Sequence, residues 1–168
     1  MLESSATKVD VFLSVGSNIA PEENLRMACR ELTAGYGELN LSSVYRNKAV
    51  GFEGGDFLNM VVAFNTAVAP EQILTRIKQL HVQAGREYQE SSFCSRTLDL
   101  DILLYGDMVR KRLKLPHQDL DKYGFVLQPM VEVAPELQHP VSGKTMSQLW
   151  DGFDAEKHHM QKVDIGIN

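Results

Sequence analysis

The pattern of apolar and polar positions predicts four strands. Every second position of residues 9–15 is apolar, which is the spacing of a strand with one buried face. Residues 39–46 and 57–68 read as two further strands, joined by a glycine-rich connection. A fourth strand is predicted within residues 95–106, SRTLDLDILLYG, where polar and apolar positions again alternate.

Other segments have apolar positions three and four residues apart, as on one face of a helix. This spacing predicts helices over residues 21–32 and 70–84, and a shorter helix around residues 126–133. Pro21 suits the first turn of the first helix, and Gly85 is suited to end the second.

The main elements follow one another in the order β-α-β-β-α-β. This order is typical of a ferredoxin-like split-βαβ sandwich, an α+β fold in which two helices cover one face of an antiparallel sheet. A chain of 168 residues is long enough for one such core. We therefore expect a single domain over residues 1–168, with a polar C-terminal tail over residues 151–168.

The chain is acidic, with a formal net charge of -5 and a pI near 5.5. Proteins that bind nucleic acid usually present a basic surface, so this charge disfavours a nucleic-acid or polyanion binder, and we expect no nucleic-acid partner. No apolar run approaches the roughly 20 residues of a membrane helix, and the N-terminus lacks the features of a secretory signal. We therefore expect a cytoplasmic protein. Cys29 and Cys94 lack the spacing of a zinc or disulfide motif.

Two aspartates interrupt the most apolar strand. On a strand Thr97, Asp99 and Asp101 share one face, whereas the intervening leucines and isoleucine share the other. Neighbouring carboxylates repel each other and require a compensating charge when partly buried. A solvated strand face is one interpretation. A Mg²⁺ site is the other, favoured by hard carboxylate oxygens and by Arg96 nearby, a combination suited to phosphoryl transfer.

Other polar and aromatic residues each have two interpretations. His117 follows a proline in a loop, where it is either an ordinary surface residue or a phosphate ligand. Asn59 lies in an apolar strand, either at a sheet edge or as an amide that reads the edge of a heterocycle. Phe57 and Phe125 are either core residues or flat surfaces for such a ring. The SGKT segment at residues 142–145 lacks the upstream glycine of a P-loop.

Several motifs together resemble one family. FLSVGSN, FLNMVVAF, RTLDLDILLYG, LPHQDLDKYGFVLQPMVEVAPEL and HPVSGKT, spread from about Val11 to Trp150, are similar to the 6-hydroxymethyl-7,8-dihydropterin pyrophosphokinases of folate biosynthesis. The resemblance implies a ferredoxin-like enzyme that transfers pyrophosphate from ATP to the pterin hydroxymethyl group and releases AMP. It also implies two Mg²⁺ ions, and we expect the chain to act as a monomer.

The resemblance implies a role for each matching residue. Asp99 and Asp101 would hold both metal ions, while Arg86 and Arg96 would contact phosphates or shape the active-site loop. The residues implied to bind ATP are Leu74, Ile102, Arg112 and His117, with Tyr123 where the family often has an arginine, and those implied to bind the pterin are Asn47, Val50, Phe57, Asn59 and Phe125.

The sequence departs from the family pattern just before residues 99–101, Asp-Leu-Asp, which we call the DLD motif. Family members commonly carry further arginines and a tryptophan before it, where this chain has Tyr88 and the residues 92–95, SFCS. His81 stands in the place of the usual glutamate. These departures predict a weak-to-moderate pyrophosphokinase, or alternatively an inactive relative that binds pterin or nucleotide. Loops 47–56 and 85–95 are expected to move during closure over the substrates.

Overall fold

The computed structural model describes residues 6–86 and 97–167. The elements in chain order are β1 (Val9–Ser17), α1 (Pro21–Tyr36), β2 (Asn40–Leu41), β3 (Val44–Asn47), β4 (Phe57–Thr66), α2 (Pro70–Gln83), β5 (Asp99–Tyr105), η1 (Lys111–Leu113), η2 (Gln118–Leu120), α3 (Gly124–Val133), α4 (Met146–Asp151), η3 (Ala155–Lys157) and β6 (Gln161–Val163).

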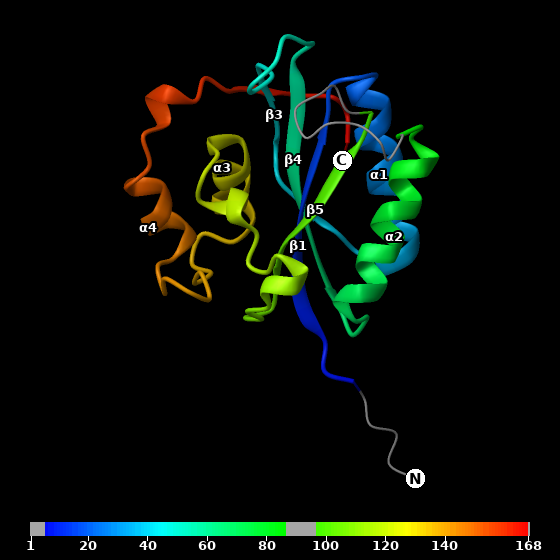
Figure 1. The fold of residues 1–168 in the computed structure, drawn as a ribbon, viewed down its shortest axis with the longest axis vertical. Helices are drawn as coiled ribbons and strands as arrows, with labels where there is room; N and C mark the ends of the chain where they lie inside the picture. The colour runs from blue at the N-terminus through cyan, green and yellow to red at the C-terminus, as the bar shows by residue number, and fades with distance from the viewer. Residues whose placement is uncertain (1–5, 87–96, 168) are drawn as a thin grey trace.

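The strands form one antiparallel sheet in the order β5-β1-β4-β3-β6, with β2 paired to β4 (Figure 1). β1 and β3 are connected through α1 and lie on either side of β4. In the same way β4 and β5 are connected through α2 and lie on either side of β1. These are two split βαβ units, and the predicted α+β fold is confirmed.

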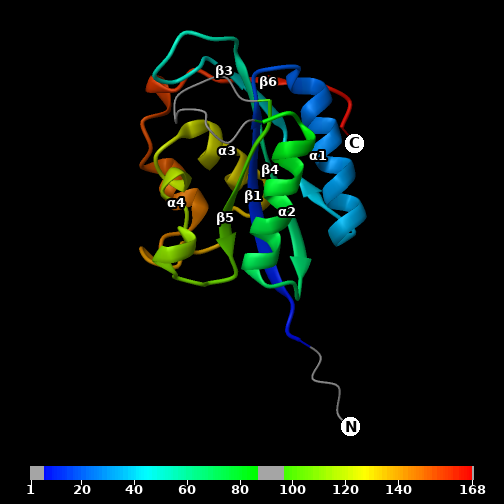
Figure 2. The same cartoon turned by 45° about the vertical axis from the view of Figure 1, so that its right-hand side comes forward.

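Helices cover both faces of the sheet, as Figures 1 and 2 show from two directions. On one face Leu25 of α1 and Ile73 of α2 pack on the apolar side of β1, β4 and β5. On the other face Leu127 of α3 and Met146 of α4 pack on Phe12 and its neighbours. The sequence predicted the first helical layer, while the second layer is a finding of the structure. None of the helices in the described part of the chain is long and apolar enough to cross a membrane.

The face assignment predicted for β5 is correct. Leu100 and Ile102 are buried in the core beneath α1 and α2, while Asp99 and Asp101 line a pocket on the opposite side. Leu104 pairs with Phe12 but Ile102 pairs with Leu13, so Leu103 is left over as a bulge. Because of the bulge, both Leu103 and Leu104 are buried in the core beneath α3, whereas strict alternation would place only one of them there.

The chain expected as a polar tail contains a strand. β6 pairs with β3, and Ile165 beyond it is only 6% exposed. The Arg26 Nε of α1 donates to the Ile165 carbonyl oxygen at 3.1 Å. This end of the chain therefore covers the edge of β3, which would otherwise expose unpaired backbone groups.

Candidate active site

The two aspartates of the DLD motif line a pocket of about 140 Å³ on the α3 side of the sheet. Typical ligand pockets measure roughly 300–1,000 Å³, so this one suits a small ring better than a nucleotide. It lies at the end of β1 and the start of β4, and it is lined by Ser14, Gly16, Asn47, Val50, Phe57, Asn59, Asp99, Asp101, Asp119, Tyr123, Phe125 and Val126.

A larger cavity of about 710 Å³ lies at the other end of β1 and β4. Asp10 is part of its wall, but its carboxylate already accepts a hydrogen bond from the Asn65 amide at 2.7 Å. None of the candidate residues from the sequence lines this cavity. The smaller pocket is therefore the candidate site, because chemistry-bearing side chains from four strands and two helical segments meet there.

Gly16 makes the floor of the pocket possible. On the central strand β1 it pairs with Asn59 on one side and with Asp99 on the other. A Cβ atom at this position would lie 2.6 Å from the Asn59 Oδ1, closer than side chains tolerate. The absence of a side chain lets the Asn59 amide lie across β1 toward the carboxylates. No local sequence pattern indicates this role, because it depends on the strand register.

Two asparagines fix each other's orientation. The Asn59 Nδ2 donates to the Asn47 Oδ1 at 2.5 Å, and the Asn47 Nδ2 donates to the Lys48 carbonyl oxygen at 3.0 Å. Asn47 is 8% exposed, so this pair is anchored in the protein. The arrangement sets which side of the Asn59 amide is the donor and which is the acceptor. Such an amide is suited to reading the edge of a heterocycle.

Aromatic rings lie around the same amide. Tyr123 and Phe125 stack with their centroids 5.0 Å apart and an interplanar angle of 15°. Phe57, which also lines the pocket, meets Phe52 edge to face with their centroids 6.2 Å apart. The exposed Val50 lies on the pocket wall, so the predicted group of apolar and amide residues is brought together.

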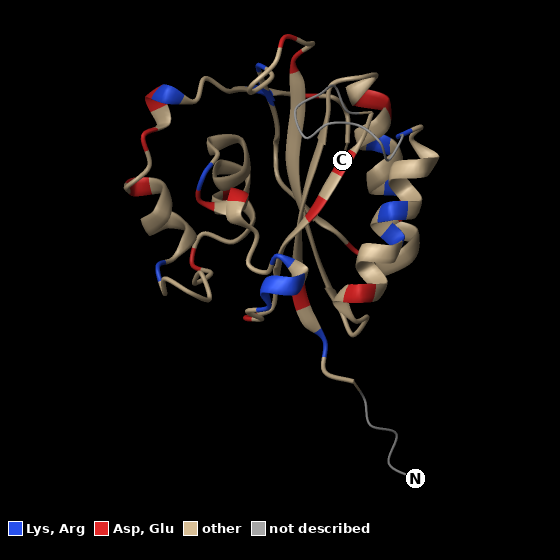
Figure 3. Ribbon diagram, viewed as in Figure 1, with Lys and Arg blue, Asp and Glu red and all other residues tan. Residues whose placement is uncertain are grey.

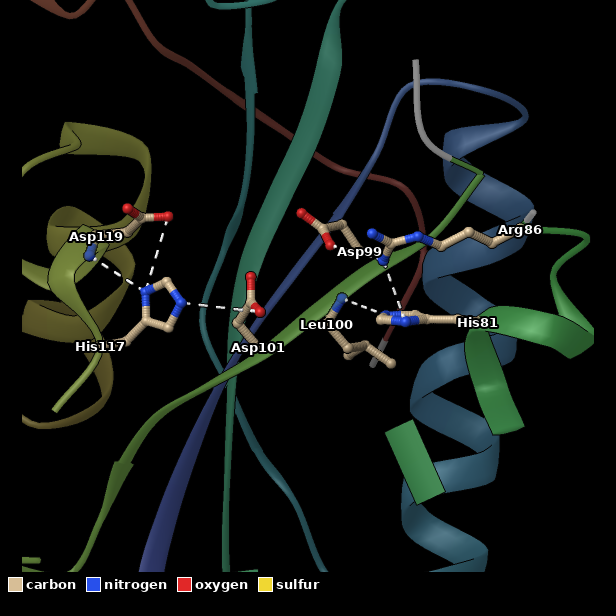
Figure 4. A network of polar contacts seen from close by, with 7 residues as sticks. All are labelled: His81, Arg86, Asp99, Leu100, Asp101, His117 and Asp119. Carbon is tan, nitrogen blue, oxygen red and sulfur yellow. Dashed lines mark hydrogen bonds and ion pairs between the residues drawn. The ribbon is translucent and has the colours of Figure 1, made fainter. Parts of the chain in front are cut away.

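The carboxylates lie between two flanking groups, shown in Figure 4. The Arg86 Nη1 lies 3.2 Å from the Asp99 Oδ1, and the His117 Nε2 lies 3.8 Å from the Asp101 Oδ1. Burial, followed by repulsion from Asp99, raises the pKa of Asp101 to about 6, although His117 acts in the opposite direction. Because 41% of the Asp101 side chain is accessible, water screens part of this effect. Asp101 is thus an electrostatically strained group.

Asp119 is a third carboxylate at the site that the sequence reasoning missed. Its backbone N–H donates to the His117 Nδ1 at 3.2 Å, so in the neutral ring the proton is on Nε2, which faces Asp101. The signal was present in the motif P-H-x-D, which places Asp119 two residues after His117. Asp119 lines the pocket, and 31% of its side chain is accessible.

Some candidate residues lie away from this pocket. Leu74 and Ile102 belong to the core on the α1/α2 side. Arg112 is exposed in η1, part of the basic segment at the bottom of Figure 3. Arg96 lies outside the described residues, as does most of the expected lid 85–95. Within the described ranges no group of three or more histidine, cysteine or acidic residues is close enough to form a metal site by itself.

The fold and site define a split-βαβ protein in which paired carboxylates adjoin an amide and aromatic pocket. Residues 12–135 match the family of 7,8-dihydro-6-hydroxymethylpterin-pyrophosphokinases (HPPK). The chain belongs to this family, which confirms the resemblance inferred from the sequence motifs.

Named relatives support this membership. The chain is 35% identical over 143 residues to the 2-amino-4-hydroxy-6-hydroxymethyldihydropteridine pyrophosphokinase of Aquifex aeolicus, covering 83% of this chain and 89% of the relative. It is 36% identical over 147 residues to the protein of the same name from Synechocystis, covering 84% of this chain and 75% of the relative.

Solved structures agree in fold. The wild-type HPPK-DHPS of Plasmodium falciparum, crystallised with pterin and p-hydroxybenzoate, matches with a TM-score of 0.72 at 14% identity. The match covers 92% of this chain, which spans only 45% of that longer chain.

Proposed function

We propose that the protein transfers the pyrophosphoryl group of ATP to the hydroxymethyl group of 6-hydroxymethyl-7,8-dihydropterin and releases AMP. One observation carries this proposal: two groups of side chains line the same pocket. The first group is the Asn47–Asn59 amide pair with the aromatic rings, and the second is the pair of carboxylates of Asp99 and Asp101. The first group suits a flat heterocycle, and the second suits a charged phosphate with its cation. Family membership supports the same assignment, because this family uses ATP as a co-substrate.

The carboxylates fit Mg²⁺, which proteins usually bind through one or two carboxylates plus substrate phosphates and water. Asp99 and Asp101 supply two hard oxygen ligands on one strand face, and burial together with the neighbouring Asp99 raises the pKa of Asp101. The described pocket lining contains three aspartates and neither lysine nor arginine. We propose that Asp99 and Asp101 hold two Mg²⁺ ions. When bound, the ions would withdraw charge from the phosphates.

The chain's own residues would position the two substrates. The oriented Asn59 amide would bind the polar edge of the pterin, and Phe57 and Phe125 would contact its faces. Arg86, which lies beside Asp99, would rotate to contact a phosphate. The Nε2–H of His117 would donate a hydrogen bond to another phosphate oxygen. The pterin hydroxyl oxygen would then attack the β-phosphorus in line. The bond from this phosphorus to the α–β bridging oxygen would break, AMP would leave with that oxygen, and the hydroxyl proton would pass to water.

The remaining assignments extend this proposal. Because the pocket is too small for a nucleotide, ATP would lie along the outer side of β5, where Arg112 and the backbone around Leu74 and Ile102 would complete its site. Tyr123, which lines the pocket, would contact ATP from the pocket side. Arg96 would contact the phosphates from the segment outside the described residues. We further propose that the protein acts as a cytoplasmic monomer on small molecules, without nucleic acid.

The test is AMP release from ATP and Mg²⁺, measured with and without 6-hydroxymethyl-7,8-dihydropterin. The native protein should release AMP only when the pterin is present, and Asp101→Ala should abolish the release. Asp107→Asn, which alters an exposed carboxyl just beyond the same strand, is the matched control and should remain active. A folded native protein that releases no AMP would contradict the proposed function.

A further inference from the structure

β5 is an edge strand, so backbone groups on its outer side have no neighbouring strand. One of them, the N–H of Leu100, lies between the two aspartates in sequence and donates to the Nε2 of His81 at 2.9 Å. His81 lies in the last turn of α2 and is 6% exposed. The imidazole thus takes the place of a strand acceptor at the centre of the DLD motif (Figure 4).

The same histidine organises the end of α2 that carries Arg86. The Arg86 N–H donates to the His81 carbonyl oxygen, and the Gly85 N–H donates to the Val82 carbonyl oxygen, both at 2.9 Å. Gly85 has φ 83°, so this is a glycine-dependent helix end of the Schellman type. The chain is turned back over its last turn, which brings the Arg86 guanidinium to Asp99 at 3.2 Å.

The ring of His81 also touches the guanidinium. The Arg86 Nη1 lies 3.1 Å from the His81 Nδ1. Since Nε2 accepts from Leu100, the proton of the neutral ring is on Nδ1, and two donor groups face each other. The ring therefore limits how closely the guanidinium can approach α2, and it does not hold the guanidinium by a hydrogen bond. The attraction on Arg86 comes from Asp99, a group that a cation would neutralise.

We propose that His81 is a positioning residue for the transfer reaction, resting on the function proposed above. His81 accepts the backbone hydrogen bond of Leu100, between Asp99 and Asp101, and helps to place Arg86 beside Asp99. When ATP binds, the Arg86 guanidinium leaves the Asp99 carboxylate and contacts a substrate phosphate. The proposal concerns the nucleotide side of the site, since His81 is not among the residues that line the amide and aromatic pocket.

Three variants separate the parts of this role. His81→Leu removes the acceptor for Leu100 and should lower kcat/KM for ATP about tenfold, the effect of one lost hydrogen bond at a positioned group. His81→Gln supplies one acceptor and should restore most of the activity. His81→Glu supplies a carboxylate that accepts from Leu100 and attracts Arg86, and glutamate is the usual residue at this position in the family, so kcat should stay close to the native value. The pterin KM should stay within about twofold in all three variants.

A purely structural role is distinguished by Ile77→Val, a core substitution on the same helix at a residue 4% exposed. It should lower thermal stability and leave both KM values unchanged. If His81→Leu behaves like Ile77→Val, or if its pterin and ATP parameters change equally, the positioning role is refuted. If the native protein itself releases no AMP, the proposed function fails and the positioning role is judged by binding. In that case His81→Leu should weaken binding of α,β-methylene-ATP with Mg²⁺ about tenfold, and unchanged binding would refute it.

Discussion

Replacing Asp101 by asparagine should stabilise the ligand-free protein while it abolishes activity. The Asp101 carboxyl is partly buried beside Asp99, and these two effects raise its pKa from 3.8 to about 6. Its ionised form therefore opposes folding. Asparagine has nearly the same shape, carries no charge, and offers Asp99 a hydrogen-bond donor. The site is thus predicted to be suited to its ligands at the expense of stability.

The size of the effect follows from the pKa. One pKa unit corresponds to about 1.4 kcal/mol, so the change to about 6 would be about 3 kcal/mol for a fully buried carboxyl. Because 41% of the side chain is accessible, we expect roughly half of this, about 1–1.5 kcal/mol. In a domain of this size the melting temperature should rise by about 3–5 °C.

The sign of the pH dependence gives a second test. A carboxyl with a raised pKa contributes stability that is complete below its unfolded value of 3.8 and is lost as the pH rises through about 6. The advantage of Asp101→Asn should therefore be largest above pH 6 and shrink toward pH 4. Thermal unfolding between these limits, with Asp107→Asn as control, measures it. A variant no more stable than the native protein at pH 8 would refute the electrostatic argument.

Adding Mg²⁺ with α,β-methylene-ATP should reverse the order, because ligands that bind the native site stabilise only the protein that retains both carboxylates. The native melting temperature should rise with ligand concentration, whereas that of Asp101→Asn should not. Equal shifts in the two proteins would show that Asp101 takes no part in binding.

Three further predictions concern the rest of the site and its support. Gly16→Ala should raise the pterin KM about tenfold with little change for ATP, since its Cβ would displace the Asn59 amide; equal effects on both substrates would count against this. Tyr45→Phe removes the hydroxyl that donates to Glu132 and should lower the unfolding free energy by about 1–2 kcal/mol in urea titrations. Burial opposes ionisation of Glu132, but hydrogen bonds from Tyr45 and Ser43 outweigh it and lower the pKa of this carboxyl. The stability difference between the native protein and Tyr45→Phe should therefore shrink below pH 4.5. A difference that does not change with pH would contradict a hydrogen bond to the ionised Glu132. Removing divalent cations with EDTA should stop AMP release and added Mg²⁺ should restore it, whereas activity in EDTA would exclude the proposed role of the carboxylates.

Local features of the site were predictable from the sequence. Asp99 and Asp101 share a face because strand side chains alternate, and this holds whatever the rest of the fold does. Phe57 and Asn59 follow the same rule on β4. The two split βαβ units also follow from the order of strands and helices along the chain.

Features that depend on register or on distant contacts were not predictable. Gly16 matters because it pairs with both Asn59 and Asp99, a relation that no local pattern contains. The bulge at Leu103 shifts the β5 pairing by one residue, and alternation alone cannot show where such a shift falls. The C-terminal strand β6 is short and polar, and only its pairing with β3 makes it a strand.

The charge distribution leads us to predict that the two proposed substrates occupy different sides of β5. The described pocket lining has three carboxylates and no lysine or arginine, so a polyphosphate would be repelled from it, whereas a neutral heterocycle would not. The cationic groups lie outside the pocket, with Arg86 at the end of α2 and Arg112 in η1. β5 is an edge strand, and its outer side faces α2 and the loop of His117 in place of another strand. We therefore predict that phosphates approach Asp99 and Asp101 from the basic side and that the pterin approaches them from the amide side.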